Sequence, residues 1–260
     1  MREDARERDE RGLLALEMDV IHGLGPAGEG TGGLPTVTDP SVRAVLAWSP
    51  GARVLALGAG VGPEGLFESA EGPGPDVDPR GAAEEAEQPY APGEPPAVLV
   101  RIAAALTTAG ERASVEGGPC FTFPDPLAAD PPAALPLLLS DEEGLEAARS
   151  LRRPDNWRPG EWAELISGAA GEWAMAVHDG APVSICHTPA ANARGAEAGI
   201  WTRPDFRGRG LAPAAVAAWS RRVGPGKEVL FYSTTAANRA SRSVARALGL
   251  TPLGWIWTVR

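Results

Sequence analysis

The stretch Gly199–Trp219, GIWTRPDFRGRGLAPAAVAAW, carries the strongest structural signal in this chain of 260 residues. Its apolar start predicts a strand that ends at Thr202, and its alanine-rich end predicts a helix that begins at Leu211. The loop between them holds Arg207-Gly-Arg-Gly210. Glycine lets the backbone approach a ligand closely, and the free amides and dipole of a helix N-terminus attract phosphate. Arginine adds forked donors that suit phosphate oxygens, so the stretch predicts an anion-binding loop.

Around this loop the predicted elements follow the order helix, helix, strand, strand, strand, helix, strand, helix, strand. The predicted strands are residues 173–177, 182–187, 196–202, 229–234 and 253–259, with Asp179-Gly180 as a hairpin turn between the first two. The predicted helices start at Ser140, as a capping residue, and at Pro159, and span residues 211–223 and 238–248. This order predicts an α/β (α+β) fold, in which a mixed sheet has helices on its faces.

The N-terminal half gives weaker signals and is predicted to be a small α/β unit. Residues 7–24 have the pattern of an amphipathic helix and residues 53–57 that of a strand. Residues 98–108 fit a strand or a buried helix equally well, and prolines interrupt residues 117–126. We predict four segments: the first part of this unit at 1–67, an acidic linker or loop at 68–97, the second part at 98–132 and a C-terminal domain at 133–260.

Charge is distributed unevenly along the chain, whose net charge is −10. Residues 68–97 hold eight acids, one base and seven prolines, a composition that cannot bury enough apolar surface to offset chain entropy. Residues 194–260 hold eleven bases and three acids. This basic end fits a nucleic-acid interface, solvated arginines, or a site for a compact polyanion such as a nucleotide or coenzyme. The sequence has no helix-turn-helix pattern and no basic run interleaved with aromatics, so no nucleic acid partner is expected.

Composition also limits the class of protein. No stretch approaches the roughly 18 consecutive apolar residues of a membrane span, and the charged N-terminus lacks the apolar segment of a secretory signal. Cys120 and Cys186 are too far apart for a metal cluster or a disulfide framework. We expect a cytoplasmic protein without a membrane association and without a metal, and the sequence leaves homodimer formation open.

Two motifs link the chain to a known family. Arg207, Gly210 and Ala212 fill in register the pyrophosphate-loop pattern of the GNAT superfamily of acyl-CoA N-acetyltransferases, which this stretch resembles. At the family's usual distance, Asn238 to Gly249 resembles its second motif, a helix with asparagine, serine and a final Leu-Gly. The resemblance covers about residues 135–260 and implies a GNAT-type mixed central sheet there, with the N-terminal α/β unit beside it.

The resemblance implies an acetyl-CoA-dependent N-acetyltransferase, which moves an acetyl group to a primary amine of a small molecule, peptide or protein. It implies direct attack by a neutral amine, whose proton a base removes. Backbone groups of one strand would pair with the pantetheine arm as an added strand does. The residues that the resemblance places against acetyl-CoA are Ile200, Trp201, Thr202, Arg207, Gly208, Arg209, Gly210, Leu211, Ala212, Asn238 and Ser241.

The sequence departs from the family at the general acid. Many members have a tyrosine seven residues after the motif asparagine, and this chain has Ala245 there. The thiolate then leaves unassisted, or Tyr232 or Ser241 replaces the tyrosine, or the protein is a poor acetyltransferase. For the base, the resemblance points to Glu197, and His187 on the neighbouring strand is the alternative because its ordinary pKa lies near neutrality.

Two other interpretations stand beside N-acetyltransfer. The missing tyrosine also fits a catalytically weak or inactive acyl-CoA-binding or interaction protein with a GNAT fold. Residues 54–62 resemble the first motif of S-adenosylmethionine-dependent methyltransferases, a strand followed by Gly58-Ala-Gly-Val-Gly62. Ala56 replaces the acid usual in that motif and no sustained helix pattern follows, so we interpret these glycines as a turn.

The remaining notable residues near the predicted site are expected mainly to pack. Cys186 is expected to be a buried small apolar residue, since direct transfer needs no nucleophilic thiol. The chain has eight tryptophans, and Trp157, Trp162 and Trp173 fall where the family shapes its acceptor pocket. Core packing explains most of them, and the sequence does not select which one would line a pocket.

Overall fold

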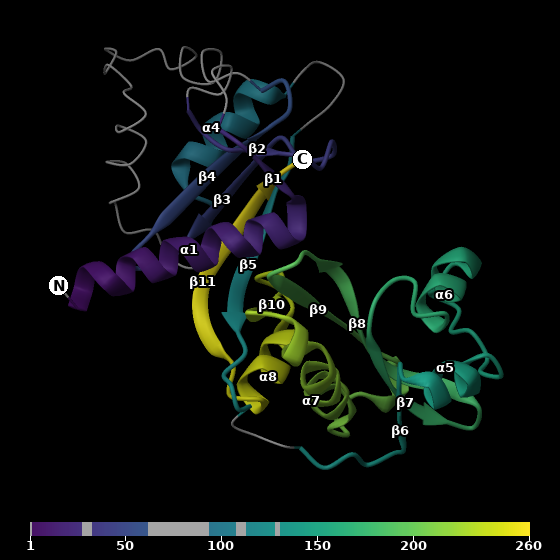
Figure 1. Ribbon diagram of the computed structural model, residues 1–260. Coiled ribbons are helices and arrows are strands. Elements are labelled where there is room, and N and C mark those ends of the chain that lie inside the picture. Colours follow the sequence, from purple (N-terminus) through teal and green to yellow (C-terminus); the bar gives the residue numbers. More distant parts are fainter. Residues whose placement is uncertain (1, 28–32, 62–93, 108–112, 128–130) are drawn as a thin grey trace, which may run out of the picture. The chain divides into compact units, whose positions relative to one another are not determined.

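The computed structural model describes residues 2–27, 33–61, 94–107, 113–127 and 131–260 (Figure 1). The chain forms two compact units. The N-terminal unit comprises Met1–Cys120, Thr234–Ala237 and Leu253–Arg260, and the C-terminal unit comprises Phe121–Ser233 and Asn238–Pro252. This division differs from the segments predicted above because the last strand of the chain pairs within the N-terminal unit. The predicted acidic linker lies outside the described residues, apart from residues 94–97.

The N-terminal unit is an α/β unit, as predicted. Its strands follow the order β1-β2-β4-β3-β11-β5, in which β3 pairs antiparallel with both β4 and β11. Helix α4 packs Leu99 and Ile102 against Leu57 and Val259 in the core of this unit. The elements are α1 (Arg2–His22), β1 (Leu24–Gly25), β2 (Thr36–Val37), β3 (Ala44–Trp48), β4 (Arg53–Gly58), α4 (Ala97–Leu106), β5 (Val115–Thr122) and β11 (Thr251–Val259).

Packing decides the ambiguous segments of this unit. The predicted helix at 7–24 and strand at 53–57 are confirmed as α1 and β4, and the segment at 98–108 is the helix α4. The expected interruption of residues 117–126 is wrong over its first part, because β5 runs through Pro119, whose carbonyl accepts a hydrogen bond from the Thr234 amide at 3.2 Å. A Cβ atom at Gly117 would lie 2.3 Å from the Trp257 ring, so glycine lets these two strands approach closely.

The C-terminal unit is a mixed sheet with strand order β10-β9-β8-β7-β6. The strands β9 and β10 are parallel and the other pairs are antiparallel. The predicted strands and helices of this unit are confirmed, and β6 is an addition that the sequence did not predict. The elements are β6 (Leu137–Leu139), α5 (Glu142–Ala148), α6 (Pro159–Ile166), β7 (Trp173–His178), β8 (Ala181–Ala191), β9 (Gly195–Thr202), η2 (Pro204–Phe206), α7 (Leu211–Val223), η3 (Gly224–Gly226), β10 (Val229–Ser233) and α8 (Arg239–Ala247).

Helices cover both faces of this sheet, as predicted. Side chains alternate along a strand, so Trp173 and Met175 of β7 point to one face and Ala174 points to the other. Trp173 and Met175 pack with Leu165 of α6, whereas Ala174 packs with Val216 of α7. We call these two sides of the sheet the α6 face and the α7 face (Figure 1).

Local turn chemistry fixes the hairpin between β7 and β8. Asp179 and Gly180 have φ angles of 49° and 68°. Two consecutive positive φ angles are typical of a type I′ turn, whose twist matches that of the flanking strands. The predicted Asp-Gly turn is therefore confirmed.

The predicted helix cap at Ser140 is wrong by one residue. Asp141 is the N-cap of α5, and its Oδ1 accepts a hydrogen bond from the Gly144 amide at 2.9 Å. Ser140 is instead buried, donates to the Glu172 carboxylate and accepts from the Trp173 amide. The Ser140 hydroxyl, which the sequence predicted to cap α5, therefore belongs to a hydrogen-bond network with residues far along the chain.

The described residues were also compared with the requirements of a membrane-spanning helix and of a metal site. Among the described helices, none combines the length and apolar character that crossing a membrane requires. Within the same residues, no three His, Cys, Asp or Glu side chains gather in a way that could hold a metal ion.

Candidate functional site

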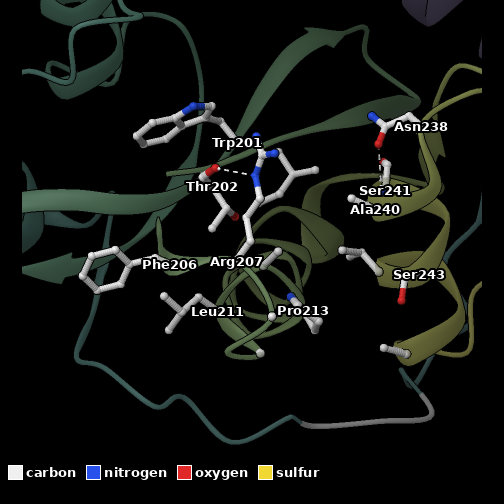
Figure 2. A pocket seen from close by; sticks show the side chains of 16 residues that line it. Trp201, Thr202, Phe206, Arg207, Leu211, Pro213, Asn238, Ala240, Ser241 and Ser243 are labelled. Atoms are coloured by element: carbon white, nitrogen blue, oxygen red, sulfur yellow. Dashed lines mark hydrogen bonds between the residues drawn. The ribbon is translucent and has the colours of Figure 1, made fainter. Parts of the chain in front are cut away.

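The site begins where the parallel pair β9–β10 ends. Gly195–Glu197 of β9 lie opposite Val229–Phe231 of β10, and the register stops there although β9 continues to Thr202. A cavity of about 550 Å³ lies beside this continuation (Figure 2). It is lined by Ile200–Thr202 of β9, by Phe206, Arg207, Gly208 and Gly210 of the loop, by Leu211–Pro213 of α7, and by Asn238, Ala240, Ser241, Ser243, Val244 and Ala247 of the α8 segment.

The N-terminus of α7 faces this cavity without a side-chain cap. Gly210 is its N-cap residue and no side chain accepts from the first-turn amides. Gly208 and Gly210 both have φ of 75°, a left-handed conformation that other residues adopt only with strain. A Cβ atom at either position would meet nothing within 4 Å, so backbone conformation, not crowding, requires glycine here. The amides of the first turn are therefore available to an anion.

The arginines of the loop have different surroundings. Arg207 lines the cavity, and its Nε donates to the Thr202 carbonyl at 3.3 Å (Figure 2). Arg209 does not line the cavity: it donates to the Asp205 carbonyl and stacks on the Phe206 ring at 4.5 Å. In the structure its side chain contacts the loop itself, and its predicted contact with the coenzyme stays a prediction. Hydrogen bonds from Arg203 lower the pKa of the Asp205 carboxyl, so this carboxylate remains ionised beside the arginines.

The wall formed by α8 is held by its own cap. Asn238 is the N-cap, and its Oδ1 accepts a hydrogen bond from the Ser241 amide at 3.1 Å (Figure 2). The Ser241 hydroxyl in turn lies 2.6 Å from the Tyr232 hydroxyl. Tyr232 is fully buried and does not line the cavity, and burial raises the pKa of its phenol. Ser241 therefore lies between the phenol and the cavity.

Glu197 is a buried carboxyl with one free oxygen. Its Oε1 accepts hydrogen bonds from the Ser233 amide at 2.6 Å and from the Ser233 hydroxyl at 2.8 Å. Its Oε2 is buried and has no hydrogen-bond partner. Burial raises the pKa of Glu197 to about 7, against the opposing effect of the Ser233 hydrogen bonds. A carboxyl with such a pKa can take up and release a proton at neutral pH.

His187 lies on β8 in a tightly packed position. A Cβ atom at Gly199 would lie 2.6 Å from its Cε1, so the imidazole fills the space above this glycine. The ring centroid is 5.2 Å from that of Trp157. Burial lowers the pKa of His187, and a hydrogen bond with the Gly199 backbone opposes this effect. Cys186 is fully buried, as predicted, and burial raises the pKa of its thiol.

The comparisons with known proteins identify this half of the chain. Residues 126–251 match the family model of the acetyltransferase (GNAT) domain. The C-terminal half of this chain is a GNAT acetyltransferase domain. No curated protein matches the sequence of the chain.

Solved structures resemble this chain remotely. An acetyltransferase of the GNAT family from Colwellia psychrerythraea is 17% identical, with 57% of each chain covered and a TM-score of 0.43. A tandem GNAT protein from the clavulanic acid biosynthesis pathway is 19% identical, with 66% of this chain and 61% of that chain covered and a TM-score of 0.43. The aminoglycoside N-acetyltransferase AAC(6')-Iy, solved with CoA, is 22% identical, with 44% of this chain and 90% of that chain covered and a TM-score of 0.33. The chain spans about three fifths of the length of the first two.

The GNAT domain brings most of the predicted coenzyme residues together. Ten of the eleven residues predicted to contact acetyl-CoA line one cavity, and Arg209 is the exception. The sequence did not single out Ala240, Ser243 or Ala247, which also line it. The interval of three and four residues between them was the available signal, since it places them on one side of a helix. Ala245, at the family's tyrosine position, is buried in the core and offers no hydroxyl.

The predicted base residues lie on the α6 face of the GNAT domain. Glu197, Gly199 and Trp201 alternate on β9 with the residues that pack on α7, and Trp201 packs with the α6 cluster. Among the described residues of this unit, buried side-chain nitrogen or oxygen atoms without a hydrogen-bond partner occur in Glu197, His187, Trp157 and Trp173. Buried polar atoms normally find partners, and such exceptions need an explanation. Here the unpartnered polar atoms gather on the α6 face, and Glu197 is among them. Its pKa of about 7 suits proton transfer at neutral pH.

Proposed function

We propose that the GNAT domain transfers the acetyl group of acetyl-CoA to a primary amine of a small molecule, peptide or protein by direct attack. The observation that carries this proposal is the uncapped N-terminus of α7, which opens on a 550 Å³ cavity together with Arg207. An anion there gains hydrogen bonds from backbone amides and attraction from the helix dipole. The family match of residues 126–251 supports the same function.

The residues present fit this coenzyme. The amides that follow Gly208 and Gly210 would hold its diphosphate, with Arg207 as the neighbouring cation. The edge of β9 from Ile200 to Thr202 would pair with the amide-containing arm, since this edge continues past the register with β10. Asn238 and Ser241 would contact the arm from the opposite wall. Acetyl-CoA supplies an activated thioester when bound.

Glu197 is proposed as the general base. A primary alkylamine has a pKa near 10 and is mostly protonated at neutral pH, so it must lose a proton to attack. The Glu197 carboxyl has a pKa of about 7 and a buried oxygen without a partner, so it can accept that proton directly or through a water molecule. His187 is the second candidate, but its burial lowers its pKa and its ring is packed between Gly199 and Trp157.

Ser241 and Tyr232 are proposed to act together as the proton source for the leaving thiolate. The Ser241 hydroxyl belongs to the cavity wall, and Tyr232 donates to it or accepts from it at 2.6 Å. The raised pKa of Tyr232 makes it a weak acid, so its contribution is to hold and polarise Ser241. A thiolate with a conjugate-acid pKa near 8.5 is also a fair leaving group by itself.

A second candidate function is acyl-CoA binding with little or no turnover. It is favoured by Ala245, which is buried where many GNAT enzymes have an acidic hydroxyl. The two functions share the cavity and differ only in turnover, so a single pair of measurements separates them.

The test is a binding titration with acetyl-CoA followed by a thiol-release assay over a panel of primary amines. We expect micromolar binding and amine-dependent release of CoA, both reduced at least tenfold by Arg207→Glu. Arg149→Glu is the control, since Arg149 is exposed and lies outside the cavity wall. Binding without turnover on any amine would select the second function, and unchanged affinity in Arg207→Glu would refute both.

A further inference from the structure

We infer that Ser233 is a positioning residue for the proposed base: its amide and its hydroxyl hold Oε1 of Glu197, so that Oε2 receives the proton of the acceptor amine. The inference rests on the proposed function, in which Glu197 is the base. It goes beyond that function by assigning a role to Ser233, which does not line the cavity, and by giving the two carboxyl oxygens different roles.

Ser233 lies where the parallel strands β9 and β10 separate. The last pair in their register is Glu197 with Phe231, and Ser233 is the final residue of β10, two positions further along. In a continued parallel ladder, a backbone carbonyl of β9 would accept a hydrogen bond from the Ser233 amide. Here Oε1 of Glu197 accepts that bond instead, at 2.6 Å. The carboxyl group is therefore fixed to the backbone at the point where the two strands part.

The Ser233 hydroxyl adds a second bond to the same oxygen. It donates to Oε1 at 2.8 Å, whereas Oε2 of Glu197 is buried and, among the described residues, accepts no hydrogen bond. Two donors stabilise negative charge on Oε1 and disfavour a proton there. When an ammonium group is deprotonated, its proton therefore forms a bond to Oε2. The electron pair of the broken N–H bond stays on nitrogen, and the neutral amine can attack.

Ser233 also sets the pH range in which the carboxyl can act as a base. Burial raises the pKa of Glu197 to about 7, and the hydrogen bonds from the Ser233 hydroxyl and amide oppose that rise. Without the hydroxyl, burial would raise the pKa of Glu197 further, because one of the two bonds that favour the charged form would be lost. Less carboxylate would then be present at neutral pH.

The titratable neighbours of Glu197 do not supply this balance. Cys186 and His187 lie on β8, and Tyr232 lies on β10. Burial raises the pKa of the Cys186 thiol and of the Tyr232 phenol, so both are neutral near pH 7, and burial lowers the pKa of the His187 imidazole. The hydrogen bonds from Ser233 are therefore what favours the carboxylate of Glu197 against its burial.

A purely structural contact would need neither the charge nor the hydroxyl. The side-chain carbonyl of a glutamine could accept from the Ser233 amide as well as a carboxylate does, and an uncharged amide costs less to bury. A structural contact also predicts that loss of the hydroxyl changes stability and leaves the pKa of the base unchanged. The two hypotheses therefore differ in a pH profile.

The first experiment compares Ser233→Ala with Ser233→Thr in pH–rate profiles of kcat/KM with one amine, whose own ionisation is the same for every variant. Ser233→Ala keeps the amide bond and loses the hydroxyl bond, so the rise near pH 7 should move to about pH 8. At pH 7 kcat/KM should then fall at least about fivefold, because the carboxylate fraction falls from about a half to about a tenth. Ser233→Thr keeps a hydroxyl and should restore both values, and acetyl-CoA affinity should be unchanged in either variant.

Ser220→Ala is the matched control. Ser220 is also a serine of the C-terminal unit, its buried hydroxyl donates to the Ala217 carbonyl at 3.0 Å within α7, and it lies outside the cavity wall. Its profile should keep the rise near pH 7, and melting curves confirm that all three variants are folded. If Ser233→Ala loses activity without a change in the pH of the rise, as a structural defect would, the inference is refuted.

A titration without substrate separates this inference from the function on which it rests. In NMR spectra of protein with isotope-labelled glutamate, the carboxyl resonance that is missing in Glu197→Gln belongs to Glu197. Its midpoint should rise from about pH 7 to about pH 8 in Ser233→Ala. An unchanged midpoint would refute the inference whatever the activity. A raised midpoint combined with full activity of Glu197→Gln would instead refute Glu197 as the base, and the positioning role would fall with it.

Discussion

Two glycine-rich turns follow strands in this chain, and they serve different purposes. At the end of β4, a Cβ atom at Gly58 would lie 2.2 Å from the Val42 carbonyl, so this glycine permits close packing of backbone. Gly60, in the turn itself, has a φ of 79° and open space around it, but no described helix begins directly after it. After β9, Gly208 and Gly210 have open space around them and adopt positive φ before a helix whose first turn is uncapped. A glycine motif therefore indicates a ligand site only when the backbone amides after it are left open to a cavity.

The same contrast extends to the strands that lead into the turns. Residues Val54, Ala56 and Leu57 of β4 are buried and apolar, whereas β9 buries Glu197. A carboxyl in an apolar surrounding costs stability, and proteins retain such groups where they are used. We therefore expect reaction chemistry to depend on β9 and only stability to depend on β4.

The largest expected effect is on the reaction. Glu197→Gln keeps the shape of the side chain and removes its basicity, so kcat/KM should fall about a hundredfold or more. In the unchanged protein, kcat/KM should rise with pH through about 7 as the Glu197 carboxylate forms, and this rise should be absent in the variant. A pH–rate profile measures both. A profile that keeps its rise in the variant would assign the base to another group, with His187 next in line.

The pH dependence of stability tests the same carboxyl without any substrate. The pKa of Glu197 is raised from an ordinary 4.5 to about 7, so the folded state binds the extra proton between these values. Its contribution to the free energy of unfolding is full below pH 4.5 and is lost as pH rises to about 7, up to about 3 kcal/mol in total. Denaturant unfolding at several pH values should show this slope, and Glu197→Gln should be less pH-dependent.

The glycine at the end of β4 should respond to substitution through stability. Gly58→Ala should lower the free energy of unfolding by about 2–3 kcal/mol, because its Cβ meets the backbone of Val42 and Arg43. Gly208→Ala should cost only about 1 kcal/mol, the strain of a left-handed residue in open space. Urea unfolding compares the two. Equal losses would remove the distinction between a packing glycine and a site glycine.

The turn after β9 should respond through binding. Gly210→Val places a branched side chain beside the uncapped amides of α7, so acetyl-CoA affinity should fall at least tenfold in a folded protein. Gly58→Ala should leave the affinity of the folded fraction unchanged. Calorimetric titration of both variants at a temperature where each is folded tests the contrast, which a tenfold loss in Gly58→Ala would contradict.

The smallest expected effect is the salt dependence. Affinity for acetyl-CoA should fall severalfold between low and physiological ionic strength, because exposed charges attract the coenzyme and salt screens them. Arg207→Gln should flatten this dependence, and the control Arg149→Gln should not. A salt-independent affinity would show that the loop binds by its amides alone.

The sequence predicted the local elements around the site because their signals are local. The helix at 211–223 has the bounds of α7, the Asp179-Gly180 turn forms as predicted, and the helix predicted at 238–248 is α8, with Asn238 as its N-cap. Each depends on the backbone preference or the capping group of residues within a few positions. The anion loop could be found in the same way, since glycine, arginine and a helix start are contiguous.

The features that depend on residues far apart in the sequence could be known only from the tertiary structure. Ser140 forms hydrogen bonds with Glu172 and Trp173 and does not cap α5. The strand β5 runs through Pro119, and the last strand, β11, pairs with β3. Packing and the Ser233 hydrogen bonds set the pKa of Glu197, and Asp205 and Phe206 turn Arg209 away from the cavity. Burial, desolvation and the competition among hydrogen-bond partners depend on which residues are close in space. The order of residues in the sequence therefore does not determine them locally.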